Sequence, residues 1–168
     1  SVLLKCLDVR DTKALHAWLG EVCATDALDL VVVNAGMNTD IGPSGEGEPW
    51  DEAEAVVDIN LKASMAIAHA VLPAMRRSRA GQIALVSSLA GYFGLPVTPA
   101  YCASKAGVKA YGEALRGWLA PEGIRVNVIM PGYVESPMCD AMPGPKPFLW
   151  QPLRAARLIQ RGLAADRA

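Results

Sequence analysis

A chain of 168 residues has the length of one domain, and a composition of 52% hydrophobic and 20% charged residues is typical of a globular protein with a substantial core. The net charge of −1 disfavours a nucleic-acid or membrane-surface partner. No apolar run approaches the ~20 residues that span a bilayer, and no basic segment leads into an apolar one at the amino terminus. We therefore expect a cytoplasmic protein without a membrane partner.

Cysteines and histidines show no spacing typical of a metal site or a disulfide framework. We expect free buried thiols, ordinary histidines and no bound metal. The residues concerned are Cys6, Cys23, Cys102, Cys139, His16 and His69.

Strands alternate with helices along the chain, which predicts one α/β domain over residues 1–168 with a mostly parallel sheet. Continuous apolar runs predict strands at 2–7, 28–33, 82–88 and 124–130. Apolar residues at helical spacing predict helices at 12–22, 49–77, 100–119 and around 154–159. Pro73 should kink or split the second helix. The proline-rich run 142–152 is either a lid over substrate or a plain connecting loop.

Tyr101 and Lys105 are four residues apart in a predicted helix, so their side chains share one face. A phenol titrates near ~10 and is a poor base at neutral pH until a cation stabilises the phenolate. If Lys105, helped by a positively charged cofactor ring, lowered this pKa by roughly three units, Tyr101 could act as a general acid or base near pH 7. The pattern Tyr-x-x-x-Lys alone also fits a plain exposed helix face.

Ser88 follows the apolar run 83–86, at the carboxyl end of a predicted parallel strand, where open α/β sheets place their sites. The loop 89–99 can fold back and bring its hydroxyl near Tyr101. Ser88 with Leu-Ala-Gly after it, followed by Tyr101-Cys-Ala-Ser-Lys105, resembles the active-site segment of the short-chain dehydrogenase/reductase family.

The resemblance implies hydride transfer between NAD or NADP and a small-molecule carbonyl or alcohol. The serine would hold the substrate oxygen, the tyrosine would move the proton, and the lysine would lower the tyrosine pKa and bind the nicotinamide ribose. Asn60, a polar residue within an apolar helix face, would be the fourth catalytic residue, its main chain holding a water that relays protons to the lysine. The plain alternative for Asn60 is an amide that is hydrogen-bonded to the backbone.

The resemblance also implies cofactor contacts at four places along the chain. An Asp-Val pair would bind the adenine, and Asn-Ala-Gly would line the cleft, although Val33 replaces the first Asn of the family's Asn-Asn-Ala-Gly. The segment 131–138 would contact the nicotinamide carboxamide, with Ser136 at the usual Thr position. The predicted cofactor-binding residues are Asp8, Val9, Asn34, Ala35, Gly36, Tyr101, Lys105, Pro131, Gly132, Val134 and Ser136.

The chain starts at Ser1 inside a predicted strand, and no glycine-rich strand-to-helix turn precedes Asn34. Family members have the sheet order 3-2-1-4-5-6-7, and the resemblance begins at the third strand. We therefore expect an N-terminally truncated, Rossmann-like fragment that is itself inactive. Residues 1–8 should be displaced, paired with the 28–33 strand, or docked on a second molecule.

Two other classes stay open. A serine hydrolase fits poorly, because Ser88 is not in Gly-x-Ser-x-Gly and both histidines precede it. A non-catalytic Rossmann-like scaffold or assembly module is the other alternative.

The resemblance further implies a homodimer or homotetramer formed through the helices 49–77 and 100–119. Their small residues permit close packing: Ala63, Ala66, Ala70, Ala106 and Ala110. Several apolar side chains suggest an apolar substrate, namely Tyr92, Phe93, Met138, Met142 and Phe148.

Overall fold

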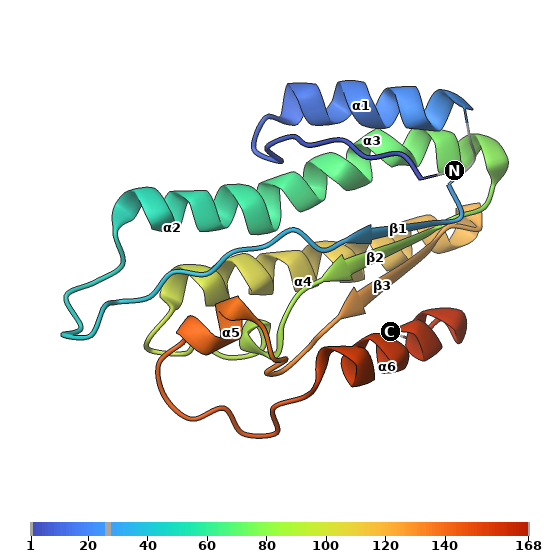
Figure 1. Cartoon of the computed structure of the whole chain (residues 1–168). Coiled ribbons are helices and arrows are strands. Elements are labelled where there is room, and N and C mark those ends of the chain that lie inside the picture. Colours follow the sequence, from blue (N-terminus) through green and yellow to red (C-terminus); the bar gives the residue numbers. More distant parts are fainter. Residues whose placement is uncertain (1, 26–27, 168) are drawn as a thin grey trace.

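A computed structural model describes residues 2–25 and 28–167 (Figure 1). Three strands form the sheet: β1 (Leu30–Val33), β2 (Gln82–Val86) and β3 (Arg125–Ile129). The longer helices are α1 (Thr12–Thr25), α2 (Trp50–Val57), α3 (Ala63–Ser78), α4 (Pro99–Leu119) and α6 (Pro152–Ala164). Shorter elements are the π-helical turn η1 (Asp58–Lys62), the 3-10 turns η2 (Leu89–Gly91) and η3 (Ala120–Glu122), and helix α5 (Pro137–Ala141).

The sheet is parallel throughout, in the order β1-β2-β3. Central strand β2 is apolar on both faces, and its Ile83, Ala84 and Leu85 are fully buried. Helix α4 packs on β3 and β2, and α1 packs on α3. In Figure 1, α1, α2 and α3 lie above the strands and α6 lies below them. This arrangement confirms the predicted α/β, Rossmann-like fold.

Residues 2–7 lie outside the sheet, so the predicted strand there is wrong. They run beside α1 in Figure 1, and Val2, Leu3 and Leu4 are 85%, 66% and 91% exposed. Within the described residues, β1 pairs only with β2, so its other edge is open. The segment was expected to be displaced, paired with the 28–33 strand, or docked on a second molecule, and the structure shows it displaced from the sheet. Without a neighbouring strand, its backbone N–H and C=O groups can bond to water instead.

The helix predicted at 49–77 is not split at Pro73, because α3 continues through that residue. Pro73 lies on the exposed side, where water can reach the carbonyl group that its missing N–H leaves free. The irregularity is instead the π-helical turn η1, which separates α2 from α3 and contains Asn60. Such turns are frequent at functional sites.

The continuous helical stretch Trp50–Ser78 corrects the expectation that no apolar segment approaches the length needed to span a bilayer. It has 29 residues and contains an 18-residue window with a mean hydropathy of 1.4, so by length and composition alone it could cross a membrane. Its Val56, Val71 and Met75 are buried in the core of the domain, so one face of this stretch packs against the rest of the protein.

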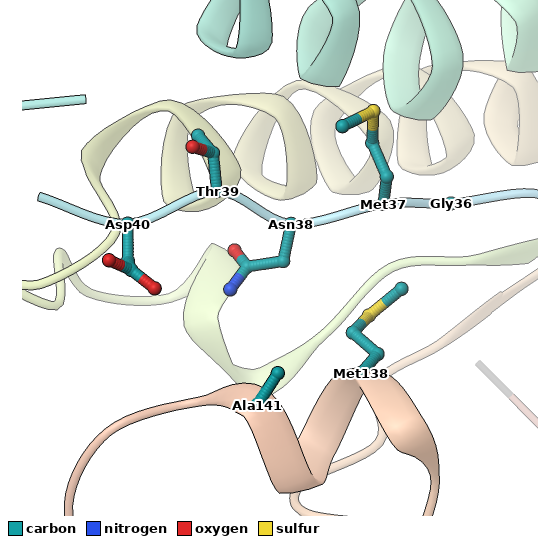
Figure 2. A pocket seen from close by; sticks show the side chains of 7 residues that line it. All are labelled: Gly36, Met37, Asn38, Thr39, Asp40, Met138 and Ala141. Atoms are coloured by element: carbon teal, nitrogen blue, oxygen red, sulfur yellow. The ribbon is translucent and has the colours of Figure 1, made fainter. Parts of the chain in front are cut away.

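Beyond β1, residues 36–40 run past α5, and a cavity of about 270 Å³ lies between them (Figure 2). The cavity is lined by Gly36, Met37, Asn38, Thr39, Asp40, Met138 and Ala141.

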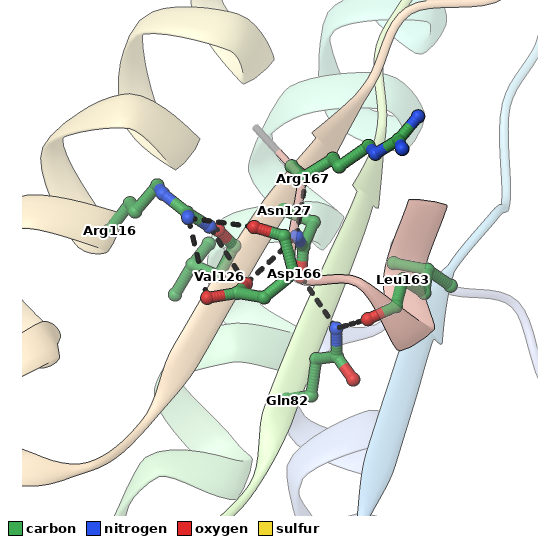
Figure 3. A network of polar contacts seen from close by, with 7 residues as sticks. All are labelled: Gln82, Arg116, Val126, Asn127, Leu163, Asp166 and Arg167. Atoms are coloured by element: carbon green, nitrogen blue, oxygen red, sulfur yellow. Dashed lines mark hydrogen bonds and ion pairs between the residues drawn. The ribbon is translucent and has the colours of Figure 1, made fainter. Parts of the chain in front are cut away.

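A polar network joins the carboxyl-terminal end of α6 to the sheet (Figure 3). Gln82 Nε2 donates to Asn127 Oδ1 (2.8 Å) and to the Leu163 carbonyl (2.9 Å). Arg116 Nη1 contacts Asp166 Oδ1 at 3.0 Å, and Asn127 Nδ2 donates to the same carboxylate oxygen at 3.1 Å. These bonds hold α6 against β2, β3 and α4.

Candidate active site

Tyr101 and Lys105 lie one turn apart in α4, with the Lys105 Nζ 5.7 Å from the centre of the Tyr101 ring. The ammonium is buried and donates to the Val86 carbonyl at the carboxyl end of β2 (2.8 Å). That carbonyl fixes the lysine between the sheet and the tyrosine.

Ser88 lies just past β2, and its hydroxyl is close enough to the Tyr101 phenol to lower the pKa of that phenol. Its Oγ also accepts from the Ala90 N–H (3.2 Å), which caps η2, and lies 3.4 Å from the Pro131 carbonyl. The loop after β2 therefore does fold back and brings Ser88, Tyr101 and Lys105 together.

Burial dominates the ionisation of both helix residues. It raises the pKa of Tyr101, while the neighbouring Ser88 hydroxyl lowers it. Burial lowers the pKa of Lys105 to about 8. The predicted lowering of the Tyr101 pKa is thus not present in this structure, because the lysine is bonded to Val86 and does not offset the loss of solvent around the phenol.

Asn60 is buried at the π-helical turn, and its side chain holds the start of the segment after β1. Its Oδ1 accepts from the Met37 N–H (2.9 Å), and its Nδ2 donates to the Met37 carbonyl (3.0 Å) and to Ser104 Oγ (2.9 Å). Its main-chain carbonyl accepts from Ser64 Oγ (2.6 Å). The side chain therefore has the backbone-bonded role of the plain interpretation, and the water relay stays a prediction.

Asn34, Ala35 and Gly36 continue from the carboxyl end of β1 beside Lys105. A Cβ added to Gly36 would lie 3.3 Å from Asn60 Oδ1 and 3.5 Å from Lys105 Nζ. A larger side chain would crowd both groups, so the glycine keeps the backbone open next to the lysine.

The segment 131–136 lies against η2 on the other side of the site. The Pro131 carbonyl accepts from the Leu89 N–H (2.9 Å), and Ser136 Oγ caps α5 by accepting from the Cys139 N–H (3.1 Å). Val134 forms a single bridge with Trp150, which ties the proline-rich run to this segment.

Within the described residues, no hydrogen bond links Asp8 to this site. Its carboxylate is exposed and bonds Arg10, whose Nη2 lies 2.6 Å away and whose hydrogen bonds lower the Asp8 pKa to about 2. Val9 follows it in the turn that leads into α1. A role for this pair toward adenine stays a prediction.

Sequence reasoning missed the groups that hold the start of α4. The Glu48 carboxylate accepts from the Ala100 N–H (2.9 Å), and the Thr98 hydroxyl lies 2.6 Å from Asn38 Oδ1. The Ser87 hydroxyl donates to the Lys105 carbonyl (2.7 Å). An acid in a glycine-rich loop gave no local signal of this role, since Glu48 is far from Ala100 in the sequence.

Two of the expectations about side chains in the site change. Tyr92, Phe93 and Phe148 are 61%, 63% and 90% exposed, whereas Met138 lines the cavity. The described residues contain no group of three or more metal-ligating side chains. All four cysteines are free thiols, but only Cys102 and Cys139 are buried as expected, whereas Cys6 is exposed and Cys23 is half-buried.

The structure is thus a Rossmann-like domain that brings Tyr101, Lys105 and Ser88 together at the carboxyl ends of its parallel strands. The sequence profile described as short chain dehydrogenase matches residues 1–144. The chain belongs to the short-chain dehydrogenase/reductase family of NAD(P)-dependent oxidoreductases.

Two relatives illustrate the match. An uncharacterized oxidoreductase of Myxococcus xanthus is 39% identical over 166 residues, which cover 96% of this chain and 64% of that protein. A 3-oxoacyl-[acyl-carrier-protein] reductase of Thermotoga maritima is 38% identical over 117 residues, which cover 69% of this chain and 46% of that protein. The chain thus spans about half to two thirds of the length of these relatives.

Solved structures agree with this assignment. The structure of gox2181 superposes with a TM-score of 0.80 at 29% identity, covering 95% of this chain and 67% of that one. A gluconate 5-dehydrogenase from Burkholderia cenocepacia, in complex with NADP and tartrate, gives a TM-score of 0.72 at 28% identity. The match covers 79% of this chain and 51% of that one.

Proposed function

We propose that the protein containing this chain transfers hydride between NAD(P)(H) and a small carbonyl or alcohol, with Tyr101 as the general acid or base. The observation that carries the proposal is the half-buried Tyr101 phenol, which lies beside Ser88 and one helical turn from the Lys105 ammonium. Asn60 completes the proposed catalytic set by holding the backbone of Met37 beside them.

The residues present fit the nicotinamide half of such a cofactor. Gly36 leaves room next to Lys105 Nζ, and an ammonium has three N–H donors, of which the Val86 carbonyl takes one. The others can reach ribose hydroxyls. Residues 34–36 and 131–136 then form the two sides of the cleft, and when bound the nicotinamide supplies or accepts the hydride.

The protein groups handle the proton. In the reducing direction, the hydroxyls of Ser88 and Tyr101 donate to the carbonyl oxygen, and the phenol gives up its proton as that oxygen becomes an alcohol. In the oxidising direction, the phenolate takes the proton. Opposite charge favours the ionised form of a phenol, so the Lys105 cation, together with the positive charge that an oxidised nicotinamide would supply, would favour this phenolate.

A hydrolase built on Ser88 is not supported by the histidines. His16 and His69 stack on one another with ring centres 5.7 Å apart, and His16 Nε2 lies 3.0 Å from the Ala66 carbonyl, on the α1–α3 side of the molecule. A non-catalytic scaffold differs from our proposal in having no turnover.

The test is a Tyr101→Phe substitution in the complete protein. It removes the proton donor with little change in packing, so we expect turnover to fall by ~10² to 10⁴ with little change in melting temperature. Cofactor absorbance with a panel of alcohols and ketones measures this. Retention of more than a tenth of the activity would contradict the role of Tyr101.

We also propose that residues 1–168 alone bind NAD(H) or NADP(H) no tighter than about millimolar and show no turnover. Pyrophosphate binds at a glycine-rich turn between a strand and a helix amino end. Within the described residues, α1 follows the irregular segment 2–11, and no such turn is formed. Calorimetry of this polypeptide with each cofactor is the measurement, and micromolar affinity would overturn the proposal.

A further inference from the structure

The cavity between residues 36–40 and α5 has one polar and one apolar wall. Residues 36–40 are extended, so alternate side chains lie on opposite sides. Figure 2 shows Asn38 and Asp40 on the side toward α5 and Thr39 on the other, where its hydroxyl donates to Glu52 (2.7 Å). Met138 and Ala141, one turn apart on α5, form the apolar wall.

The polar wall presents a donor and an acceptor. Asn38 Oδ1 is engaged by the Thr98 hydroxyl at 2.6 Å, so the Asn38 amide offers its N–H groups. Asp40 Oδ1 accepts from the Gly42 N–H at 2.8 Å, so its second oxygen offers an acceptor. Hydroxyl groups both donate and accept, and a ligand carrying two of them satisfies this wall.

The charge of the cavity is negative. Asp40 is half-buried, and none of the residues that line the cavity within the described chain is a lysine, arginine or histidine. A ligand carboxylate would lie near Asp40 without a compensating cation on the wall, and like charges at such separations repel in a partly buried site.

Both walls continue into the proposed active site. Gly36 borders Lys105 and Asn60, and Thr98, which bonds Asn38, is the residue before α4 and its Tyr101. On the other side, α5 follows the segment that begins at Pro131, whose carbonyl contacts the loop of Ser88. A molecule reacting at Tyr101 would therefore extend into this cavity.

We infer that the cavity selects a small, neutral alcohol or ketone with additional hydroxyl groups, and that Asp40 is the specificity-determining residue that excludes carboxylates. The inference rests on the proposed function. It differs from the apolar substrate that the aromatic residues of the sequence suggested, because most of those side chains lie on the surface.

The experiment compares three six-carbon compounds of matched length in the complete protein: sorbitol, gluconate and hexan-2-ol. We expect the wild-type kcat/KM with NAD or NADP to be highest for the neutral polyol. Asp40→Asn keeps the shape and the Gly42 contact but removes the charge. It should raise kcat/KM for gluconate at least tenfold and lower that for sorbitol by only a few-fold.

Asp140→Asn is the matched control. It removes the same charge from the exposed side of α5 without lining the cavity, and it should leave the gluconate-to-sorbitol ratio unchanged. Equal wild-type activity on gluconate and sorbitol, an unchanged ratio in Asp40→Asn, or turnover only of hexan-2-ol or of other alcohols would overturn the inference while the proposed function stands. No turnover of any alcohol or ketone would overturn both.

Discussion

Lys105 is held as a buried cation, and this has a consequence for stability as well as for chemistry. Only 4% of the residue is exposed, and burial lowers its pKa from 10.5 to about 8. Between these two values the unfolded chain holds the proton and the folded chain releases it. The contribution of this lysine to the free energy of unfolding therefore rises with pH across that window.

We predict that the wild-type chain gains stability relative to Lys105→Met as pH rises from 8 toward 10. The gain is at most about 3 kcal/mol, at 1.36 kcal/mol per pKa unit. Below pH 8 the lysine is charged in both states, and the difference should be flat. Urea unfolding at several pH values, with exposed Lys13→Met as the control, measures it. A difference that falls with rising pH would contradict burial as the cause.

At the same scale, some site residues could be predicted from the sequence and others could not. The spacing of Tyr101 and Lys105 fixes a shared helix face, and the apolar run before Ser88 fixes its place at a strand end. The bonds that Asn60 makes to Met37 and that Glu48 makes to Ala100 arise from tertiary contacts, which leave no periodic pattern. Asp8 matched a family position, yet its neighbour Arg10 holds it on the surface.

At the scale of elements, the close approach of α4 to the sheet depends on Gly112. A Cβ added there would lie 2.5 Å from Val128 Cγ2 on β3 and 3.0 Å from Leu85 Cδ1 on β2. Both neighbours are short side chains in the packed region under the helix, with little freedom to move. The helix can therefore lie this close to the strands only with glycine at that position.

We predict that Gly112→Ala destabilises the chain by about 1–3 kcal/mol through overpacking, despite the better helix propensity of alanine. Gly117 lies in the same helix with nothing within 4 Å of an added Cβ, so Gly117→Ala should stabilise by about 0.5–1 kcal/mol. Chemical denaturation of the two variants tests the pair. A stabilising Gly112→Ala would show that the helix can move away from the sheet at little cost.

The element boundaries show where sequence patterns lose information. Periodicity predicted α1, α4 and the three sheet strands to within a few residues, since one buried face or a fully buried strand repeats regularly. The segment 2–7 has an equally apolar pattern, but no strand lies beside it and it forms no strand. Whether a strand forms there depends on a neighbouring strand to pair with, which composition does not reveal. The turn η1 has no compositional signal at all.

At the scale of the whole molecule, α2, α3 and α4 present exposed apolar and small residues that another copy could cover. Val57 and Met65 are 40% and 43% exposed, and Ala106 and Ala110 lie on the exposed face of α4. Ala63, expected at an interface, is instead buried in the core, and Ala66 and Ala70, also expected there, are partly buried against that core. A surface of this kind on two neighbouring helices suits a self-complementary contact.

We predict a homodimer or homotetramer formed through these helices. Met65→Arg and Ala110→Arg should each place a long charged side chain in the contact without entering the core, and so shift the protein to monomer at micromolar concentration. Leu158→Arg, on an exposed site of α6 (54%), adds the same charge elsewhere and should leave the assembly intact. Light scattering with circular dichroism separates dissociation from unfolding. A wild-type monomer, or an equal effect of Leu158→Arg, would show that α3 and α4 do not form the interface.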